Sequence, residues 1–65
     1  MRVLINQEPH ELPEGTTLAD AVLTVGANGP YAVAVNLNFV PRTQYAQTLL
    51  QEGDHVEIIT PAAGG

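Results

Sequence analysis

The sequence predicts an α+β fold in which a mixed sheet of four to five strands packs against one helix. Three observations support this class. Apolar and polar residues alternate near both ends of the 65-residue chain, one internal stretch carries apolar residues at helical spacing, and 45% of the residues are hydrophobic. This content suffices for a small core and argues against intrinsic disorder. A chain of this length forms one domain, which we expect over residues 1–60, followed by a flexible tail over residues 61–65.

The N-terminal residues predict a β-hairpin. Residues 1–6 favour a strand, because every second residue is apolar and falls on one face: Met1, Val3 and Ile5. We predict the turn at residues 7–9, since Pro9 cannot donate a backbone hydrogen bond to a neighbouring strand. Residues 10–13 then form a short second strand with Leu12 directed inward, and the nearby prolines place this strand at an edge of the sheet.

Residues 17–25 predict the helix. Thr17 is followed three positions later by Asp20, which resembles a capping box with the shorter Asp in place of Glu. An apolar stripe at positions i, i+3, i+4 and i+7 follows: Leu18, Ala21, Val22 and Val25. Gly26 ends the helix as a left-handed cap.

The middle of the chain predicts two further strands. Residues 31–36 are apolar on both faces, which is typical of a central strand. Residues 36–38 favour a tight turn, and residues 39–40 favour a short strand that Pro41 closes.

The last third of the chain predicts a loop and the final strand. Residues 42–50 form a loop with one helical turn, and three of its side chains can fill the core: Tyr45, Leu49 and Leu50. Residues 55–60 favour a strand with Val56 and Ile58 facing inward. The first and last strands can lie parallel in the middle of the sheet, because the helix supplies the crossover that parallel pairing requires. This order predicts a β-grasp, or ubiquitin-like, roll.

The composition excludes several classes of function. The chain has no cysteine, and its two histidines, His10 and His55, lie far apart without a ligand cluster, so we expect neither disulfides nor a metal site. Two arginines and no lysine against seven acidic residues give a net charge of −5, which argues against nucleic acid and anionic membranes as partners. We see neither a transmembrane segment nor a signal peptide. We therefore expect a cytoplasmic monomer whose partners are proteins.

The usual catalytic arrangements are missing from the sequence. It has no Cys–His pair, no serine, and no glycine-rich loop that leads into a helix with a lysine. Three carboxylates cluster near the predicted hairpin: Glu8, Glu11 and Glu14. Paired carboxylates can act in acid–base catalysis, but beside an edge strand they more often keep that edge solvated. We therefore expect no catalytic residue and no cofactor.

The C-terminal residues offer a different chemistry. The chain ends in Gly64 and Gly65 after two alanines, so the last carboxylate has no side chain beside it, and Ala63 and Gly64 can thread a narrow cleft. Attack of this carboxylate on the α-phosphate of ATP would give an acyl-adenylate. A sulfur nucleophile could then displace AMP and leave a thiocarboxylate. The absence of lysine and cysteine fits this scheme, since no side chain of the chain itself could capture the activated carbon.

Several segments together resemble the ThiS family of sulfur carriers in thiamine biosynthesis. The resemblance covers nearly the whole chain and is carried by residues 34–36, residues 40–42, Tyr45, residues 52–54, residues 56–60, and the terminal Gly64 and Gly65. The chain departs from the family at Tyr45, where tryptophan is frequent, and at the two alanines of the tail, where a bulky aliphatic residue is common.

The resemblance implies a β-grasp fold, no catalytic activity, and a role for Gly65 as the residue that carries sulfur. It implies that a ThiF-type enzyme adenylates Gly65 with ATP, and that a sulfurtransferase or cysteine desulfurase supplies the sulfur. Thiazole synthase (ThiG) would then accept the sulfur to build the thiazole ring.

Three apolar residues are candidates for partner docking. Leu4 and Ile59 alternate out of phase with their core-facing neighbours, and Phe39 lies on a short exposed strand. If they are adjacent, they form a patch where the adenylating enzyme or thiazole synthase could bind, although scattered apolar residues are ordinary on protein surfaces. We expect Arg42 to bond loop carbonyls or a carboxylate such as Glu52 or Asp54.

Other families share parts of this pattern. Residues 12–20 and 52–60 also resemble the TGS module, a binding or regulatory domain without catalytic activity. The small subunit of molybdopterin synthase shares the tail and the sulfur chemistry, and its resemblance would imply a different sulfur acceptor. A ubiquitin-like modifier would share the activation step but deliver the acyl group to a lysine. The Gly-Gly end favours a sulfur carrier over the TGS module.

Overall fold

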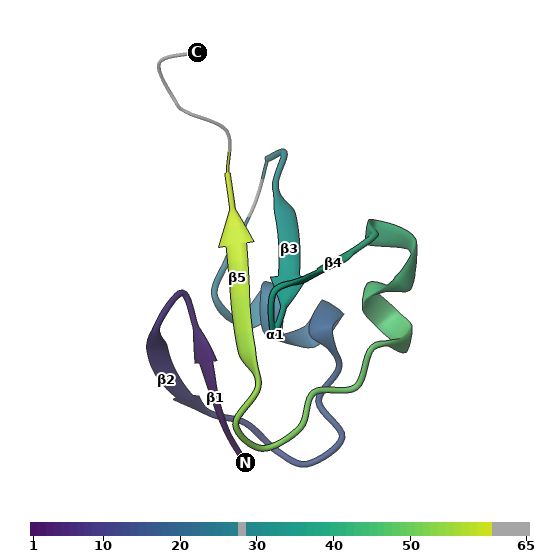
Figure 1. The fold of residues 1–65 in the computed structure, drawn as a ribbon. Coiled ribbons are helices and arrows are strands. Elements are labelled where there is room, and N and C mark those ends of the chain that lie inside the picture. Colours follow the sequence, from purple (N-terminus) through teal and green to yellow (C-terminus); the bar gives the residue numbers. More distant parts are fainter. Residues whose placement is uncertain (28, 61–65) are drawn as a thin grey trace.

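The structure, a computed structural model, describes residues 1–27 and 29–60. Within them, five strands form one mixed sheet in the order β2-β1-β5-β3-β4, and helix α1 lies against one face of it (Figure 1). The elements are β1 (Arg2–Ile5), β2 (Glu8–Glu11), α1 (Leu18–Thr24), β3 (Ala32–Val35), β4 (Asn38–Val40), the 3-10 helix η1 (Arg42–Gln47) and β5 (His55–Ile59).

The predicted α+β class and β-grasp topology are confirmed. β1 and β5 are parallel neighbours in the interior of the sheet, with Leu4 opposite His55, and the other strand pairs are antiparallel. β3 has a neighbour on each side, as predicted for a central strand, with Val33 buried in the core and Ala32 and Ala34 on the open face. The chain can place β1 beside β5 only because α1 and the segments around it cross between them.

The first hairpin differs from its prediction by two residues. β2 begins at Glu8, so Pro9 lies inside the edge strand and the turn consists of Asn6 and Gln7. Both turn residues have positive φ, 51° and 71°, as a two-residue turn of type I′ requires. Pro9 is tolerated because one side of an edge strand has no neighbour to which a backbone N–H must donate.

The second hairpin repeats this geometry. Asn36 and Leu37 form its two-residue turn, again with φ values of 51° and 71°, while Asn38 already belongs to β4. The predicted turn over residues 36–38 is therefore correct in place and one residue too long.

Helix α1 begins and ends as the sequence predicts. The Thr17 hydroxyl oxygen accepts a hydrogen bond from the Asp20 backbone N–H at 3.2 Å, which satisfies one free donor of the first turn. The chain leaves the helix after Val25, and Gly26 has a positive φ of 74°. Val25 was wrongly predicted to join the buried stripe: it is the C-cap residue and stays 37% exposed.

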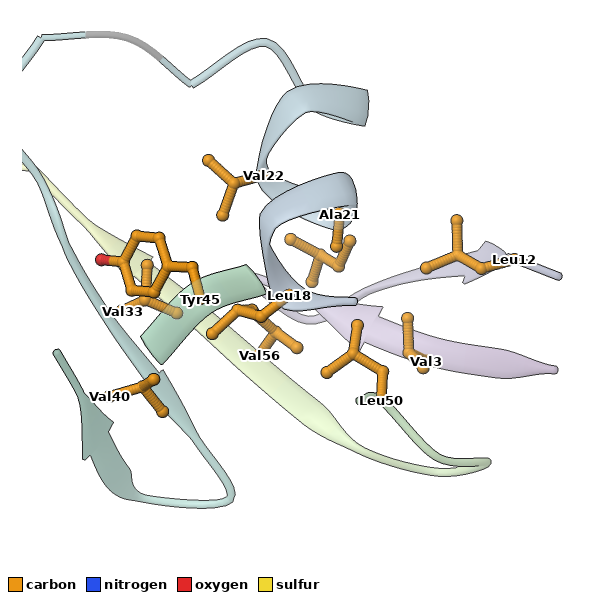
Figure 2. Close-up of a cluster of buried hydrophobic side chains, with 11 residues drawn as sticks. Val3, Leu12, Leu18, Ala21, Val22, Val33, Val40, Tyr45, Leu50 and Val56 are labelled. Atoms are coloured by element: carbon orange, nitrogen blue, oxygen red, sulfur yellow. The ribbon is translucent and has the colours of Figure 1, made fainter. Parts of the chain in front are cut away.

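The core lies between the sheet and α1 (Figure 2). Leu18 of α1 is fully buried, and so are Val3, Val33 and Val56, which face it from the sheet. Tyr45 and Leu50 fill the core from the segment after β4, as predicted, and Ile58 packs against it from β5. Leu49, predicted to do the same, is 61% exposed, because its neighbour Leu50 takes the inward position.

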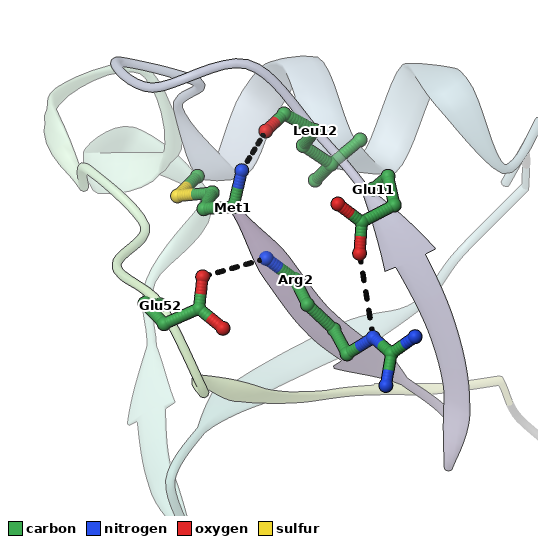
Figure 3. A network of polar contacts seen from close by, with 5 residues as sticks. All are labelled: Met1, Arg2, Glu11, Leu12 and Glu52. Carbon is green, nitrogen blue, oxygen red and sulfur yellow. Dashed lines mark hydrogen bonds and ion pairs between the residues drawn. The ribbon is translucent and has the colours of Figure 1, made fainter.

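Hydrogen bonds connect the N-terminal residues to the end of the first hairpin and to the loop before β5 (Figure 3). The terminal ammonium of Met1 donates to the Leu12 carbonyl oxygen at 2.7 Å, and the Arg2 backbone N–H donates to Glu52 Oε1 at 2.9 Å. The Arg2 guanidinium pairs with Glu11 at 3.3 Å, but both side chains are largely exposed, so this ion pair contributes little stability. Glu11 thus lies on the solvated edge strand, as predicted.

Candidate functional site

The predicted reactive residues, Ala63, Gly64 and Gly65, lie outside the described residues, as does the predicted tail over residues 61–65. The structure describes the end of β5, from which that segment continues. Ile59 is the last residue of β5 and lies opposite Ala32 of β3, so the sheet holds the chain firmly up to this point. We call Ile59 and Thr60 the tail root.

A shallow hollow lies beside the tail root. It has a volume of about 330 Å³ and is lined by Pro30, Tyr31, Ala32, Ile59 and Thr60. Four of these five side chains are apolar or aromatic, so the hollow is mainly apolar. It contains no acid–base or nucleophilic pair that could act on the tail itself.

An aromatic stack borders this hollow. The rings of Tyr31 and Tyr45 are stacked, with centroids 6.2 Å apart and planes inclined by 13°, and the Arg42 guanidinium carbon lies 5.5 Å from the Tyr31 centroid. Burial raises the pKa of the Tyr45 phenol above its usual value of 10.0, Tyr31 raises it further, and the Arg42 charge opposes the rise. The Tyr45 hydroxyl is therefore neutral at physiological pH.

The expected partners of Arg42 are engaged elsewhere. Glu52 accepts from the Arg2 backbone N–H, and the Asp54 carboxylate accepts from the Gln51 backbone N–H at 2.8 Å and from the Asn36 side chain at 3.0 Å. Arg42 instead stacks on Tyr31, a cation–π contact with a residue that lines the hollow. The prediction that Arg42 bonds one of these carboxylates was wrong.

Two of the three predicted docking residues lie together on the open face of the sheet. Ile59 is 58% exposed and pairs with Ala32, while Phe39 is 69% exposed and pairs with Ala34, two residues further along β3. We call these four residues the apolar sheet patch. It adjoins the tail root, because Ile59 belongs to both.

Leu4 lies apart from this patch. It is half-buried and lies opposite His55 at the start of β5, four residues before Ile59 or about 13 Å along the strand. Glu57 projects from β5 between these two positions, on the same face. Alternation along the strand places Glu57 and Ile59 on one face, so the sequence could show this carboxylate. It could not show that Leu4 lies beside His55 and not beside Ile59.

A second hollow, which we call the β5 trough, surrounds Leu4. It has a volume of about 440 Å³ and is lined by Leu4, Gln7, Asn36, Leu37, His55, Val56 and Glu57. Leu37 stands out because 88% of it is exposed. The sequence predicted only that this residue lies in a turn. An apolar residue between two asparagines is the feature that could have marked it as an exposed contact residue.

The described residues, 1–27 and 29–60, contain no group of three or more His, Cys, Asp and Glu side chains that could hold a metal ion. No helix among them has the length and apolar character needed to cross a membrane.

Comparisons with known proteins agree on one family. The family model described as the ThiS family matches residues 3–65. The sulfur carrier protein ThiS of Escherichia coli (strain K12) is 30% identical over 66 residues, which span 100% of both chains. A thiazole synthase of Magnetococcus marinus is 37% identical over 67 residues, which span 100% of this chain but only 20% of that protein.

A solved structure shares the fold. The thiamine biosynthesis protein (ThiS) from Geobacter metallireducens superposes with a TM-score of 0.81 over 100% of both chains, at 23% sequence identity. At this identity the likeness establishes the β-grasp fold alone.

Proposed function

The chain belongs to the ThiS family, and from this we propose that it is a sulfur carrier of thiamine biosynthesis whose reactive group is the carboxylate of Gly65. The observation that carries the proposal is the match to the family over residues 3–65, together with 30% identity to a curated sulfur carrier over its complete length. The protein acts as a co-substrate of other enzymes and has no catalytic residue of its own.

The chemistry has two balanced steps. The Gly65 carboxylate attacks the α-phosphate of ATP, which forms an acyl-adenylate and releases pyrophosphate. A sulfur nucleophile at the oxidation level of sulfide then attacks the acyl carbon, and AMP leaves as the thiocarboxylate forms. A ThiF-type enzyme catalyses the first step. A sulfurtransferase or cysteine desulfurase supplies the sulfur as a persulfide, and a thiol reduces it to the level of sulfide while a disulfide forms. Because ATP is consumed, we place the carrier in the cytoplasm.

The end of β5 suits this role. Pairing between Ile59 and Ala32 fixes the tail root, while a fully extended run from residue 60 to residue 65 spans at most about 20 Å. Ala63 and Gly64 present little side chain, so an enzyme can hold the body of the carrier at a distance and still reach the Gly65 carboxylate through a narrow channel.

The partner surface is proposed to be the apolar sheet patch. Its two large residues, Phe39 and Ile59, are exposed next to the tail root, so a partner that covers them also approaches the tail. Leu4 contributes separately, from the β5 trough. Thiazole synthase is supported as a partner by the relative of that name, one fifth of which is similar to this entire chain.

Intact mass spectrometry tests the proposal. We would incubate the chain with ATP, a ThiF-type enzyme, a cysteine desulfurase, cysteine and a thiol reductant. We expect a mass gain equal to the exchange of one oxygen for sulfur, mapped to Gly65. Addition of thiazole synthase should then drain the thiocarboxylate, whereas drainage by molybdopterin synthase alone would assign the carrier to that enzyme. No mass change, with both activating enzymes active on another carrier, would favour a TGS-like binding module.

A further inference from the structure

We propose that the β5 trough is a second docking point, at which thiazole synthase covers Leu37 with an apolar surface and directs a lysine or arginine side chain to Glu57. The inference rests on the proposed function, because it names how one partner of the sulfur carrier is recognised. It concerns Leu37, in the turn near the start of β5, and Glu57, which precedes Ile59 by two residues on the same face, and it assigns both a role in selecting the partner.

Two features of Leu37 are energetically unfavourable, and the fold requires neither of them. It occupies the second position of a type I′ turn with φ of 71°, where glycine or asparagine is preferred, and it exposes 88% of an apolar residue. The equivalent position of the first hairpin has the same φ of 71° but holds Gln7, a polar residue. A partner surface that covers Leu37 would offset the cost of its exposure.

The trough is preformed, because both hairpin turns are tied to β5. Asn6 Oδ1 accepts from the Ile58 backbone N–H at 2.8 Å, and Asn36 Oδ1 accepts from the His55 backbone N–H at 3.0 Å. These two bonds hold the two hairpin turns beside β5, one on each side of it (Figure 1). Gln7 and Leu37, which belong to these turns, both line the trough. A partner that binds here would not have to order the loops first, which favours affinity.

The charge of the trough points to a basic occupant. Glu57 contributes a half-buried carboxylate to its lining, and no arginine or lysine is among the lining residues. Among the residues that the structure describes, the ion pair of Arg2 with Glu11 is the one formed, so Glu57 has no ionic partner there. In a chain of net charge −5, a lysine or arginine beside an apolar surface is the complementary chemistry.

Thiazole synthase is the occupant that the observations favour. A protein of that name carries, within one polypeptide, a segment 37% identical to this whole chain. The trough also begins at the far end of β5 from Ile59, about 13 Å along the strand, so contact there leaves the tail free to enter an active site.

Affinity measurements on Leu37→Gly and Glu57→Gln test the inference. Leu37→Gly gives the turn its preferred Asn-Gly sequence, so the melting temperature should equal or exceed that of the parent protein. Its Kd for thiazole synthase should nevertheless rise about tenfold, as for other anchoring residues at interfaces. Glu57→Gln should raise the Kd by a similar factor at low salt and flatten its dependence on ionic strength.

Matched variants separate this role from general effects. Leu37→Met keeps an apolar side chain and should retain affinity. Leu23→Ala removes a leucine that is 75% exposed on α1, and Glu14→Gln removes a carboxylate outside the trough, so both should bind as the parent does. An unchanged Kd for Leu37→Gly, or an equal loss in Leu23→Ala, would overturn the inference.

The test is also distinct from that of the proposed function. With ATP, the ThiF-type enzyme and the sulfur source present, Leu37→Gly should form the thiocarboxylate as fast as the parent chain. Normal thiocarboxylate formation with an unchanged Kd for thiazole synthase would refute the docking point alone, whereas failure of the parent chain to form a thiocarboxylate would refute the carrier function. Slower adenylation of Leu37→Gly with unchanged binding of thiazole synthase would place the adenylating enzyme in the trough and overturn the assignment.

Discussion

Replacing Phe39 by alanine should weaken partner binding by a factor that the exposure of this ring predicts. Complete burial of a phenylalanine side chain contributes about 1.5–3 kcal/mol, so covering the 69% that is exposed in the free protein contributes about 1–2 kcal/mol. This energy corresponds to a rise in Kd of about 5- to 30-fold. Phe39 lies on the edge strand β4 and is not a core residue, so the variant should keep its fold.

Isothermal titration calorimetry with the adenylating enzyme and with thiazole synthase would measure both Kd values, and circular dichroism would confirm folding. Leu49→Ala is the matched control, because Leu49 is 61% exposed but lies opposite Thr17, away from the apolar sheet patch. It should leave both Kd values unchanged. If Phe39→Ala binds both partners as tightly as the parent protein does, the patch is not a docking surface and the reasoning from exposure fails.

Three further outcomes are expected. Deletion of Gly65 should abolish adenylation, measured by pyrophosphate release, while the melting temperature stays the same; activity of the truncated chain would refute the tail mechanism. Gly64→Val should fold normally yet slow adenylation, because a β-branched side chain restricts the backbone and fills the channel; a normal rate would argue against a threaded tail. Because the pKa of Tyr45 is raised in the folded protein, its hydroxyl loses its proton at a lower pH in the unfolded chain than in the folded one. The free energy of unfolding therefore falls as the pH rises above about 10. In Tyr45→Phe, the free energy of unfolding measured by urea denaturation should fall less steeply between about pH 8 and 11. A fall as steep as that of the parent protein would exclude Tyr45 as its source.

Elements with a strong periodic pattern could be predicted from the sequence. The first and last strands and the helix follow from alternation, from the Thr17 cap and from Gly26, since each depends on residues close together in the chain. The first turn was predicted in the wrong place because proline usually interrupts a strand, and Pro9 therefore indicated the turn. Asn6 and Gln7 adopt positive φ although neither is glycine, the residue that would have indicated the turn at this position.

Contacts set by distant segments could not be predicted in this way. Leu49 and Leu50 are neighbours in an irregular segment, and either could have been the buried residue. The Leu50 backbone N–H donates to the Thr16 carbonyl oxygen at 3.0 Å, and in this position the Leu50 side chain is the one that enters the core. The stacking of Arg42 on Tyr31 likewise depends on how η1 meets the start of β3. Such choices depend on tertiary packing, which overrides local preference.

If the proposed function is correct, the arrangement of the open sheet face explains how the carrier serves two enzymes. Both must reach the same carboxylate, at most about 20 Å from the tail root, and both are proposed to cover the apolar sheet patch beside it. A patch of four residues cannot be covered twice, so the two enzymes must bind in turn. A shared patch also cannot tell them apart, and the contact that does so must lie outside it. The β5 trough meets this requirement through Leu37, because the trough begins at the opposite end of β5 and this exposed leucine lies outside the patch. Its carboxylate, Glu57, borders the patch opposite Ala34 and adds a charge that only one partner needs to match.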